Sequence, residues 1–412
     1  MAATEPESLG WRGLSAVLVA MFAITVGYGV ALPILPFLIE QIAGASTPQA
    51  LSWHTGLLTG AYIIAIFIGA PIWGRISDRC GRKPIILVGL LGFAVTTGFF
   101  AVTESLPLLY LGRFLGGLFA AAITPVAYAL IGDYAPSKEW RAHRFALINI
   151  AGTAGFFIGP LLGGLAMRVA GRVWILSPDR SLAMPLLTAT GLAVIAAVSV
   201  VILLPSGSRR DNVDVTPDTA QIERPAMLRL LAIALVTALA IGVFEVGLAL
   251  RGKDLGLDAA HIGIMFAECS LVMAVVQALV FSPLIKPEFT RWFIAPGLAT
   301  LAIGLVVVSV VNTSVLMSVA VALVAASAGL LSPVATYWSS FGIPTSQGAQ
   351  LGRMTAAASL GQALGSVAGG ALFNLPVLPD ASFLLAALLI LATLLASIRL
   401  PRLLMPEPTA SR

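Results

Sequence analysis

Three ionisable residues inside long apolar segments are the first candidates for chemistry in this sequence. Arg113, Glu245 and Glu268 each lie within such a segment. A charged side chain is costly in hydrocarbon and is therefore usually functional. Counted from the segment ends, all three lie roughly 7–11 Å below one boundary at about 1.5 Å per residue. The proton affinity of a carboxylate rises on desolvation and falls beside a cation, so Glu245 or Glu268 could carry a proton.

The same residues allow a second interpretation. Arg113 and a carboxylate could form a permanent ion pair that only holds the protein together. Glu268 is the weaker proton carrier, because it lies near a helix end where it could simply meet water. The sequence leaves these alternatives open.

The composition identifies the medium that surrounds these residues. Of the 412 residues, 58% are hydrophobic and 10% are charged, whereas a soluble domain carries about 25% charged residues. Hydrocarbon admits only helices or closed barrels, because every backbone polar group must be satisfied internally. Apolar runs of ~20 residues fit helices across a ~30 Å core, not ~10-residue barrel strands. We therefore predict an all-α membrane protein.

Breaks between the apolar runs predict twelve transmembrane helices. The most polar stretch, 206–226, is predicted to be a cytoplasmic linker between two pseudo-symmetric six-helix bundles, 1–205 and 227–412. The predicted spans are 14–38, 55–74, 84–103, 107–131, 145–167, 183–204, 228–250, 261–284, 292–311, 314–338, 352–374 and 381–399.

The basic residues predict the orientation. Most of the 24 lysines and arginines lie in loops on the side that both termini share. By the positive-inside rule, both termini are predicted to be cytoplasmic, in a multi-pass protein of the cell (inner) membrane. The net charge of +5 follows from this bias, so we expect no nucleic-acid partner. We also expect no cleavable signal peptide and, with two cysteines, no disulfide framework.

A glycine pattern occurs once in each half of the chain at identical spacing. Such small-residue faces let helices approach closely, which is one sufficient explanation. Their equivalent place in the two halves favours an internal duplication, as in transporters whose substrate site lies between repeats. The pattern comprises Gly155, Gly159, Gly163 and Gly164, then Gly361, Gly365, Gly369 and Gly370.

The loop between the second and third spans reads Gly74-Arg-Ile-Ser-Asp78-Arg79-Cys-Gly81-Arg82-Lys83-Pro84. Gly81 permits an unusual backbone turn, and Pro84 can open the next helix. A simple topological anchor would need the bases but neither the aspartate nor the glycines. The loop closely resembles the signature loop of the major facilitator superfamily.

Three further segments resemble the twelve-helix drug:proton antiporter branch of that family, which includes tetracycline and multidrug efflux proteins. Two departures are Gly116, where the family has glutamine, and Ala146, where it has an upstream glycine. The segments are Gly29-Val-Ala-Leu-Pro33-Ile-Leu-Pro36, Arg113-Phe-Leu-Gly116-Gly117 and Gly155-Phe-Phe-Ile-Gly159-Pro160-Leu-Leu-Gly163-Gly164.

The resemblance implies roles for several residues. Asp78 and Arg82 would act with Asp133 as a cytoplasmic conformational gate, against the alternative of a bare topological anchor. Arg113 and Glu245 would face each other across a central cavity. Other polar residues in the spans could line that cavity or only pack; these are Tyr28, Tyr128 and Gln362.

The leading functional hypothesis is export of a small amphipathic or drug-like compound in exchange for protons, by alternating access. The alternatives are import or facilitated diffusion of a nutrient on the same fold and, remotely, an integral membrane enzyme. The three histidines are dispersed, so we expect no metal site. The sequence has no recognisable nucleotide-binding motif, which argues against direct ATP coupling. We expect a monomer in the lipid bilayer, with a small-molecule substrate, protons as the coupling ion and no cofactor.

Overall fold

The computed structural model describes most of the chain, and the described residues form helices without β-strands. Residues 206–223 of the predicted linker lie outside this part, whereas Arg224 already begins a helix. The structure describes residues 9–43, 47–134, 138–172, 182–205, 224–280, 285, 287–310, 313–339, 347–375 and 377–404.

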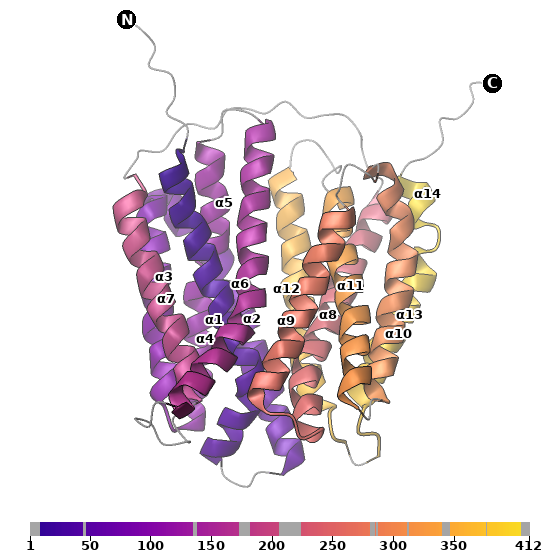
Figure 1. Ribbon diagram of the computed structural model, residues 1–412. Coiled ribbons are helices and arrows are strands. Elements are labelled where there is room, and N and C mark those ends of the chain that lie inside the picture. Colours follow the sequence, from indigo (N-terminus) through magenta and orange to yellow (C-terminus); the bar gives the residue numbers. More distant parts are fainter. Residues whose placement is uncertain are drawn as a thin grey trace, which may run out of the picture. The chain divides into compact units, whose positions relative to one another are not determined.

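Each of the twelve predicted spans is mostly helical where it is described (Figure 1). Among the described residues, ten helices are long and apolar enough to cross a membrane, and Ala381–Ser397 is a shorter apolar helix. The elements are α1 (Trp11–Ala43), α2 (Pro48–Cys80), α3 (Arg82–Val102), α4 (Leu106–Ala120), α5 (Ile123–Asp133), α6 (Lys138–Arg172), α7 (Ala183–Leu203), α8 (Arg224–Asp254), α9 (Ala259–Val280), η2 (Pro287–Phe293), α10 (Ile294–Ser309), α11 (Ser314–Ser339), α12 (Gln347–Ala371), α13 (Ala381–Ser397) and α14 (Leu400–Leu404).

The fourth span is not the single helix that was predicted, because it breaks between α4 and α5. Pro125 has no N–H to donate to the carbonyl four residues earlier. At the break the N–H of Ala122 turns to the carbonyl of Phe119, which leaves the carbonyl of Leu118 without its helical donor. The indole Nε1 of Trp73 on α2 donates to that carbonyl at 2.7 Å. The ninth predicted span also differs, since its first residues belong to the 3-10 helix η2.

The described helices form two compact units, and each contains a short piece of the other half of the sequence. The first comprises Met1–Gly44, Ala61–Asp214 and Ala259–Ala267. The second comprises Ala45–Gly60, Val215–Asp258 and Glu268–Arg412. The beginning of α2 therefore packs with the second unit, and the beginning of α9 packs with the first.

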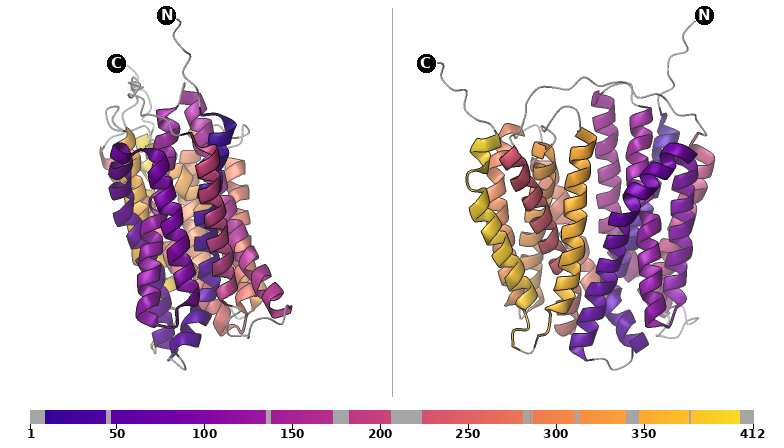
Figure 2. Two further views of the ribbon diagram at one scale, coloured as in Figure 1. Left: turned by 90° about the vertical axis from the view of Figure 1, so that its left-hand side faces the viewer. Right: turned by 180° about the vertical axis from the view of Figure 1, so that it is seen from behind.

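Each unit repeats one packing scheme (Figures 1 and 2). In the first unit α1 packs against α6 and α7, and α3 packs against α4 and α7. In the second unit α8 packs against α12 and α13, and α10 packs against α11 and α13. The same neighbours thus recur one half-chain later, as a duplicated architecture requires.

Four of the repeated glycines, Gly155, Gly159, Gly361 and Gly365, lie at close helix contacts of this scheme. A Cβ added to Gly159 of α6 would lie 2.7 Å from the carbonyl oxygen of Val26 on α1. In α12, a Cβ at Gly361 or Gly365 would collide with the backbone of α8. Because only glycine fits at these positions, the glycine faces set the α1–α6 and α8–α12 distances.

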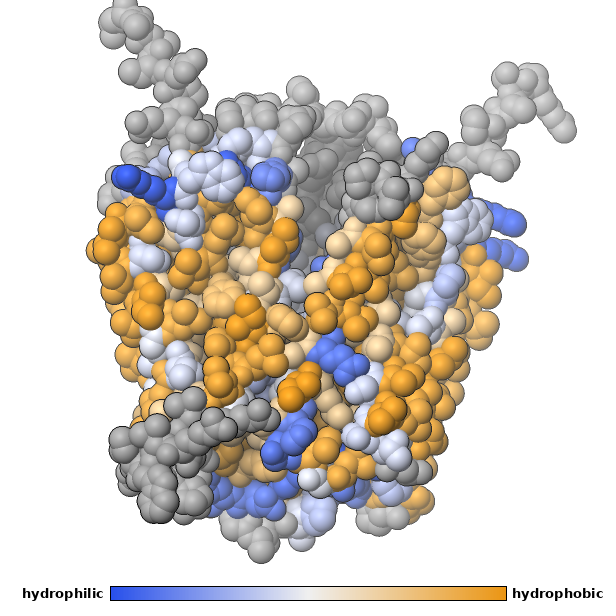
Figure 3. Space-filling view, viewed as in Figure 1, coloured by the Kyte–Doolittle hydropathy of each residue, from blue (hydrophilic) through white to orange (hydrophobic). Residues whose placement is uncertain are grey.

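Large apolar side chains cover much of the outer surface (Figure 3). Val95, Ile202 and Val315, on three different helices, are 71%, 72% and 74% exposed. In water such exposure would mark a binding or aggregation surface. On helices long enough to span a membrane it is the surface that meets lipid.

Candidate functional site

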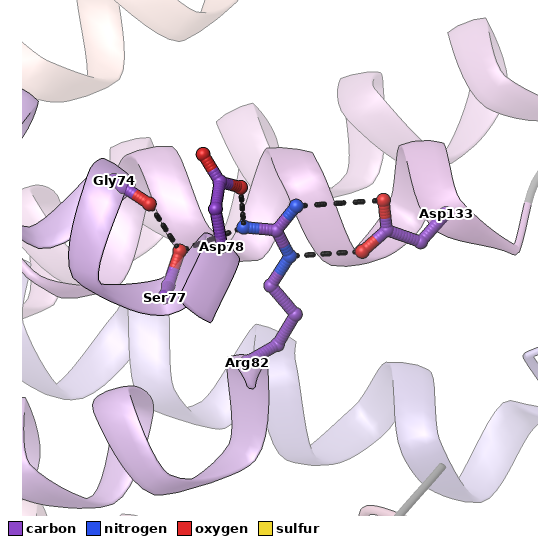
Figure 4. A network of polar contacts seen from close by, with 5 residues as sticks. All are labelled: Gly74, Ser77, Asp78, Arg82 and Asp133. Carbon is purple, nitrogen blue, oxygen red and sulfur yellow. Dashed lines mark hydrogen bonds and ion pairs between the residues drawn. The ribbon is translucent and has the colours of Figure 1, made fainter. Parts of the chain in front are cut away.

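The signature loop forms a charged cluster around Arg82 (Figure 4). Its Nε lies 2.8 Å from Oδ2 of Asp133, and its Nη1 lies 2.6 Å from Oδ1 of Asp78. Nη1 also donates to Oγ of Ser77 at 2.7 Å, and that hydroxyl donates to the carbonyl of Gly74. One guanidinium therefore joins three elements, and charge-assisted bonds of this kind are stronger than neutral ones.

Gly81 creates this geometry. It separates α2 from α3 with φ 90° and ψ 158°, a backbone region that is essentially restricted to glycine. The turn makes Arg82 the first residue of α3, four positions after Asp78 at the end of α2. Asp133 is the last residue of α5, so the break in the fourth span lies one short helix away from the cluster.

The neighbouring bases of the loop differ in their contacts. Nζ of Lys83 donates to the carbonyl of Val201 at 2.9 Å and also to that of Leu204. These carbonyls end α7, where a cation is favourable. Arg79 is exposed. The structure thus brings Asp78, Arg82 and Asp133 together and places Arg79 outside the cluster.

Arg113 is buried in the first unit and lies against aromatic rings. Its guanidinium carbon lies 4.5 Å from the ring centroid of Tyr62 and 5.8 Å from that of Tyr28. A cation over a desolvated aromatic face is stabilised by about 2 kcal/mol. Gly117, one turn along α4, allows this approach, because a Cβ there would collide with the backbone of Tyr62.

Glu245 is buried in the second unit, on α8, and is held by Gln362 of α12. The side-chain Nε2 of Gln362 donates to both carboxylate oxygens, at 3.2 and 3.0 Å. Glu268 is half-buried on α9, and the adjacent Cys269 is close enough to both carboxylates for each to act on its thiol electrostatically. Arg113 and Glu245 belong to different units, so their predicted pairing stays a prediction.

A cavity of about 210 Å³ lies within the second unit, between α8, α11 and α12. The described lining residues are uncharged and combine hydroxyl, amide and apolar side chains. Gln362 lines it at the end nearest to Glu245 along α8 and α12. The polar lining residues are Thr237, Ser332, Thr336, Thr355, Ser359 and Gln362.

The remaining predicted residues have structural partners. The hydroxyl of Tyr128 donates to Oδ1 of Asn149 at 2.8 Å, and the ring of Tyr28 stacks on that of Tyr62. In the antiporter-like segment, the carbonyl of Pro160 faces Gly263 of α9, and Gly164 lies beside Ala260. Among the described residues no group of histidine, cysteine and acidic side chains could hold a metal ion.

A family model described as Major Facilitator Superfamily matches residues 17–347. The chain belongs to the Major Facilitator Superfamily. It is therefore a multi-pass membrane transporter and not an enzyme.

Two relatives match different lengths of the chain. Multidrug resistance protein 1 of Bacillus subtilis (strain 168) is 27% identical over 374 residues, 88% of this chain and 90% of its own. The class E tetracycline resistance protein of Escherichia coli is 34% identical over 155 residues, 38% of this chain and 37% of its own. The predicted membership of the drug:proton antiporter branch is confirmed.

Solved structures of the superfamily share the fold. The POT family transporter PepTSo superposes with a TM-score of 0.75 at 14% identity, over 98% of this chain and all of its own. The predicted all-α fold with two six-helix bundles is confirmed.

The sequence did not reveal several residues of this site. Tyr62 completes the Arg113 cluster, Ser77 completes the Arg82 cluster, and Thr237 lines the cavity. Ser77 lies inside the signature loop, so its spacing could have indicated it. Tyr62 and Thr237 lie within apolar spans and carry no sequence signal of their own.

Proposed function

We propose that this superfamily member exports small amphipathic or drug-like compounds in exchange for protons, by alternating access. The support is the cavity that Gln362 connects to Glu245, whose described lining residues are neutral polar and apolar. Strongly anionic or sugar substrates would call for more charged or polar groups. The multidrug and tetracycline resistance relatives point to the same substrate class.

Glu245 is the proposed proton carrier. Helices α11 and α13 contain no charged residue, and α12 contains only Arg353 near its start. Asp254, the other acid of α8, ends that helix. Glu245 is therefore the single carboxylate in the apolar interior of these four helices. A conformational change that altered the hydration of Glu245 would change its proton affinity.

Transport in everted membrane vesicles tests this proposal. Under an imposed proton gradient, vesicles with the wild-type protein should accumulate a fluorescent lipophilic dye and consume the gradient. Glu245→Gln should abolish dye-linked proton flux, whereas Glu268→Gln, the matched acid-to-amide control, should retain it. Accumulation only in right-side-out vesicles would instead indicate import, and full proton coupling in Glu245→Gln would exclude this carrier.

The remaining parts of the proposal concern gating and placement in the cell. The cluster of Asp78, Arg82 and Asp133 would stabilise one conformation of the cytoplasmic side and break in the other. The protein would act as a monomer in the cell (inner) membrane with both termini in the cytoplasm. A cysteine-accessibility scan of the loop at Cys80 from each side of the membrane tests this orientation.

A further inference from the structure

The side chain of Gln362 contacts both the cavity and the buried carboxylate of Glu245. This side chain lines the cavity between α8, α11 and α12, and its Nε2 donates to both oxygens of Glu245. Glu245 itself is not among the cavity-lining residues. The amide of Gln362 is therefore the direct hydrogen-bonded link between the cavity and the buried carboxylate.

The chemistry of the two groups makes this link directional. An ionised carboxylate only accepts hydrogen bonds, so it holds the N–H end of the amide and leaves the carbonyl end turned away from it. A protonated carboxyl group can donate its O–H, and the carbonyl oxygen of the amide is then the better partner. A half-turn about the last side-chain bond of Gln362 exchanges the two ends.

We propose that Gln362 is a positioning residue that transmits the protonation state of Glu245 to the substrate cavity by this half-turn. The inference rests on the proposed proton-coupled export and adds its coupling residue and substrate class. With Glu245 ionised, the carbonyl oxygen serves the cavity and binds an N–H donor. With Glu245 protonated, the N–H end replaces it and expels that donor. Substrate and proton thus exclude each other, as exchange requires.

The cavity lining supports a substrate with an apolar body and an N–H-donating head group. Ile233, Leu331 and Met354 supply apolar surface. The hydroxyl of Thr237, 2% exposed, has no hydrogen-bond partner among the described residues. Since an unsatisfied buried polar group is costly, this hydroxyl is available to a ligand. Thr237 lies two helical turns before Glu245 on α8, on the same side of the helix.

The backbone around Gln362 is fixed, so the half-turn is confined to the side chain. A Cβ at Gly242 of α8 would collide with the carbonyl oxygen of Gln362. That oxygen also accepts a hydrogen bond from Oγ of Ser366 at 2.9 Å. Glu268 and Cys269 of α9 are the titratable groups near Glu245. The other charged or titratable groups on α8 and the described helices packed against it are Arg224, Arg229, Arg251, Lys253 and Asp254 of α8, Tyr337 of α11, Arg353 of α12 and Arg402 of α14.

Two probes of equal charge test the inference on the purified full-length protein. 4-Phenylbutylammonium donates N–H bonds, and its N,N,N-trimethyl analogue does not. Wild type should bind the primary ammonium roughly tenfold more tightly, the size of one charge-assisted hydrogen bond, and should release more protons on binding it. Gln362→Met should lose this preference, while Gln277→Met, at a half-buried glutamine of α9, should keep it.

The outcomes separate the inference from the proposed function. If Gln362→Met retains the tenfold preference, Gln362 is not the link. If wild type releases no protons with either probe and Glu245→Gln behaves identically, the proton-carrier proposal itself fails. Wild type alone offers a second measurement should the variant misfold. Its preference for the primary ammonium should vanish at low pH, and a preference independent of pH would overturn the inference.

Discussion

Arg82 and Asp133 are 51 positions apart in the chain, yet Nε of the arginine lies 2.8 Å from Oδ2 of the aspartate. Nη2 of Arg82 lies 3.5 Å from Oδ1 of Asp133, so the contact is bidentate. The Asp133 side chain is 18% exposed and the Asp78 side chain 56%. Because solvent screens exposed pairs, the bond to Asp133 is the stronger of the two.

Replacing Arg82 with lysine tests the bidentate contact between Arg82 and Asp133. Lysine keeps the charge but is a point donor and cannot reach Asp133, Asp78 and Ser77 together. We expect Arg82→Lys to reduce the initial transport rate about tenfold or more, since the loss of one charge-assisted bond amounts to roughly 1.5–3 kcal/mol. Arg79→Lys, at the exposed base of the same loop, should transport normally. Equal transport rates in both variants would refute a role for the bidentate guanidinium contact.

The backbone at Gly81 provides an independent test of the same cluster. Gly81→Ala forces a side chain into φ 90°, ψ 158°, which costs about 1–3 kcal/mol. We expect a lower melting temperature and slower transport. Gly74→Ala is the control, because nothing lies within 4 Å of a Cβ added there. A melting temperature unchanged by Gly81→Ala would show that the loop relaxes without strain.

The α8–α12 contact should be sensitive to a single methyl group. A Cβ at Gly365 would collide with the carbonyl oxygen of Leu239, and overpacking typically costs 1–3 kcal/mol. Gly365→Ala should therefore lower the melting temperature in detergent. Gly352→Ala, near the start of the same helix with no atom within 4 Å, should leave it unchanged or raise it. Similar melting temperatures for the two variants would contradict this packing.

The ring under Arg113 should matter more than the Tyr62 hydroxyl. Tyr62→Phe keeps the aromatic face 4.5 Å from the guanidinium, whereas Tyr62→Leu removes it. We expect Tyr62→Leu to lose about 2 kcal/mol of stability from the cation–π contact, together with some packing. Thermal unfolding of both variants checks this expectation, and comparable losses would show that the hydroxyl, not the ring, supports Arg113.

Parts of the candidate site could be predicted because they lie in short, glycine-marked segments. Asp78, Gly81 and Arg82 occur within five positions of the chain, and a loop this short allows few conformations. Glu245 was recognisable because a lone acid is conspicuous among apolar residues. Its partner was not, since Gln362 lies 117 positions away and only the packing of α12 against α8 brings the amide to the carboxylate.

The sequence by itself determined that twelve apolar segments become helices, because hydrocarbon leaves each backbone no partner except itself. It also determined the duplication, since the same glycine spacing occurs in both halves. Only the tertiary structure decided which side chains meet. Gln362 contacts Glu245, Tyr62 lies beneath Arg113, and Arg82 reaches Asp133 through close helix approaches and a break at Ala121–Ala122. Backbone hydrogen bonds form within each segment, whereas side-chain partners depend on how distant helices pack.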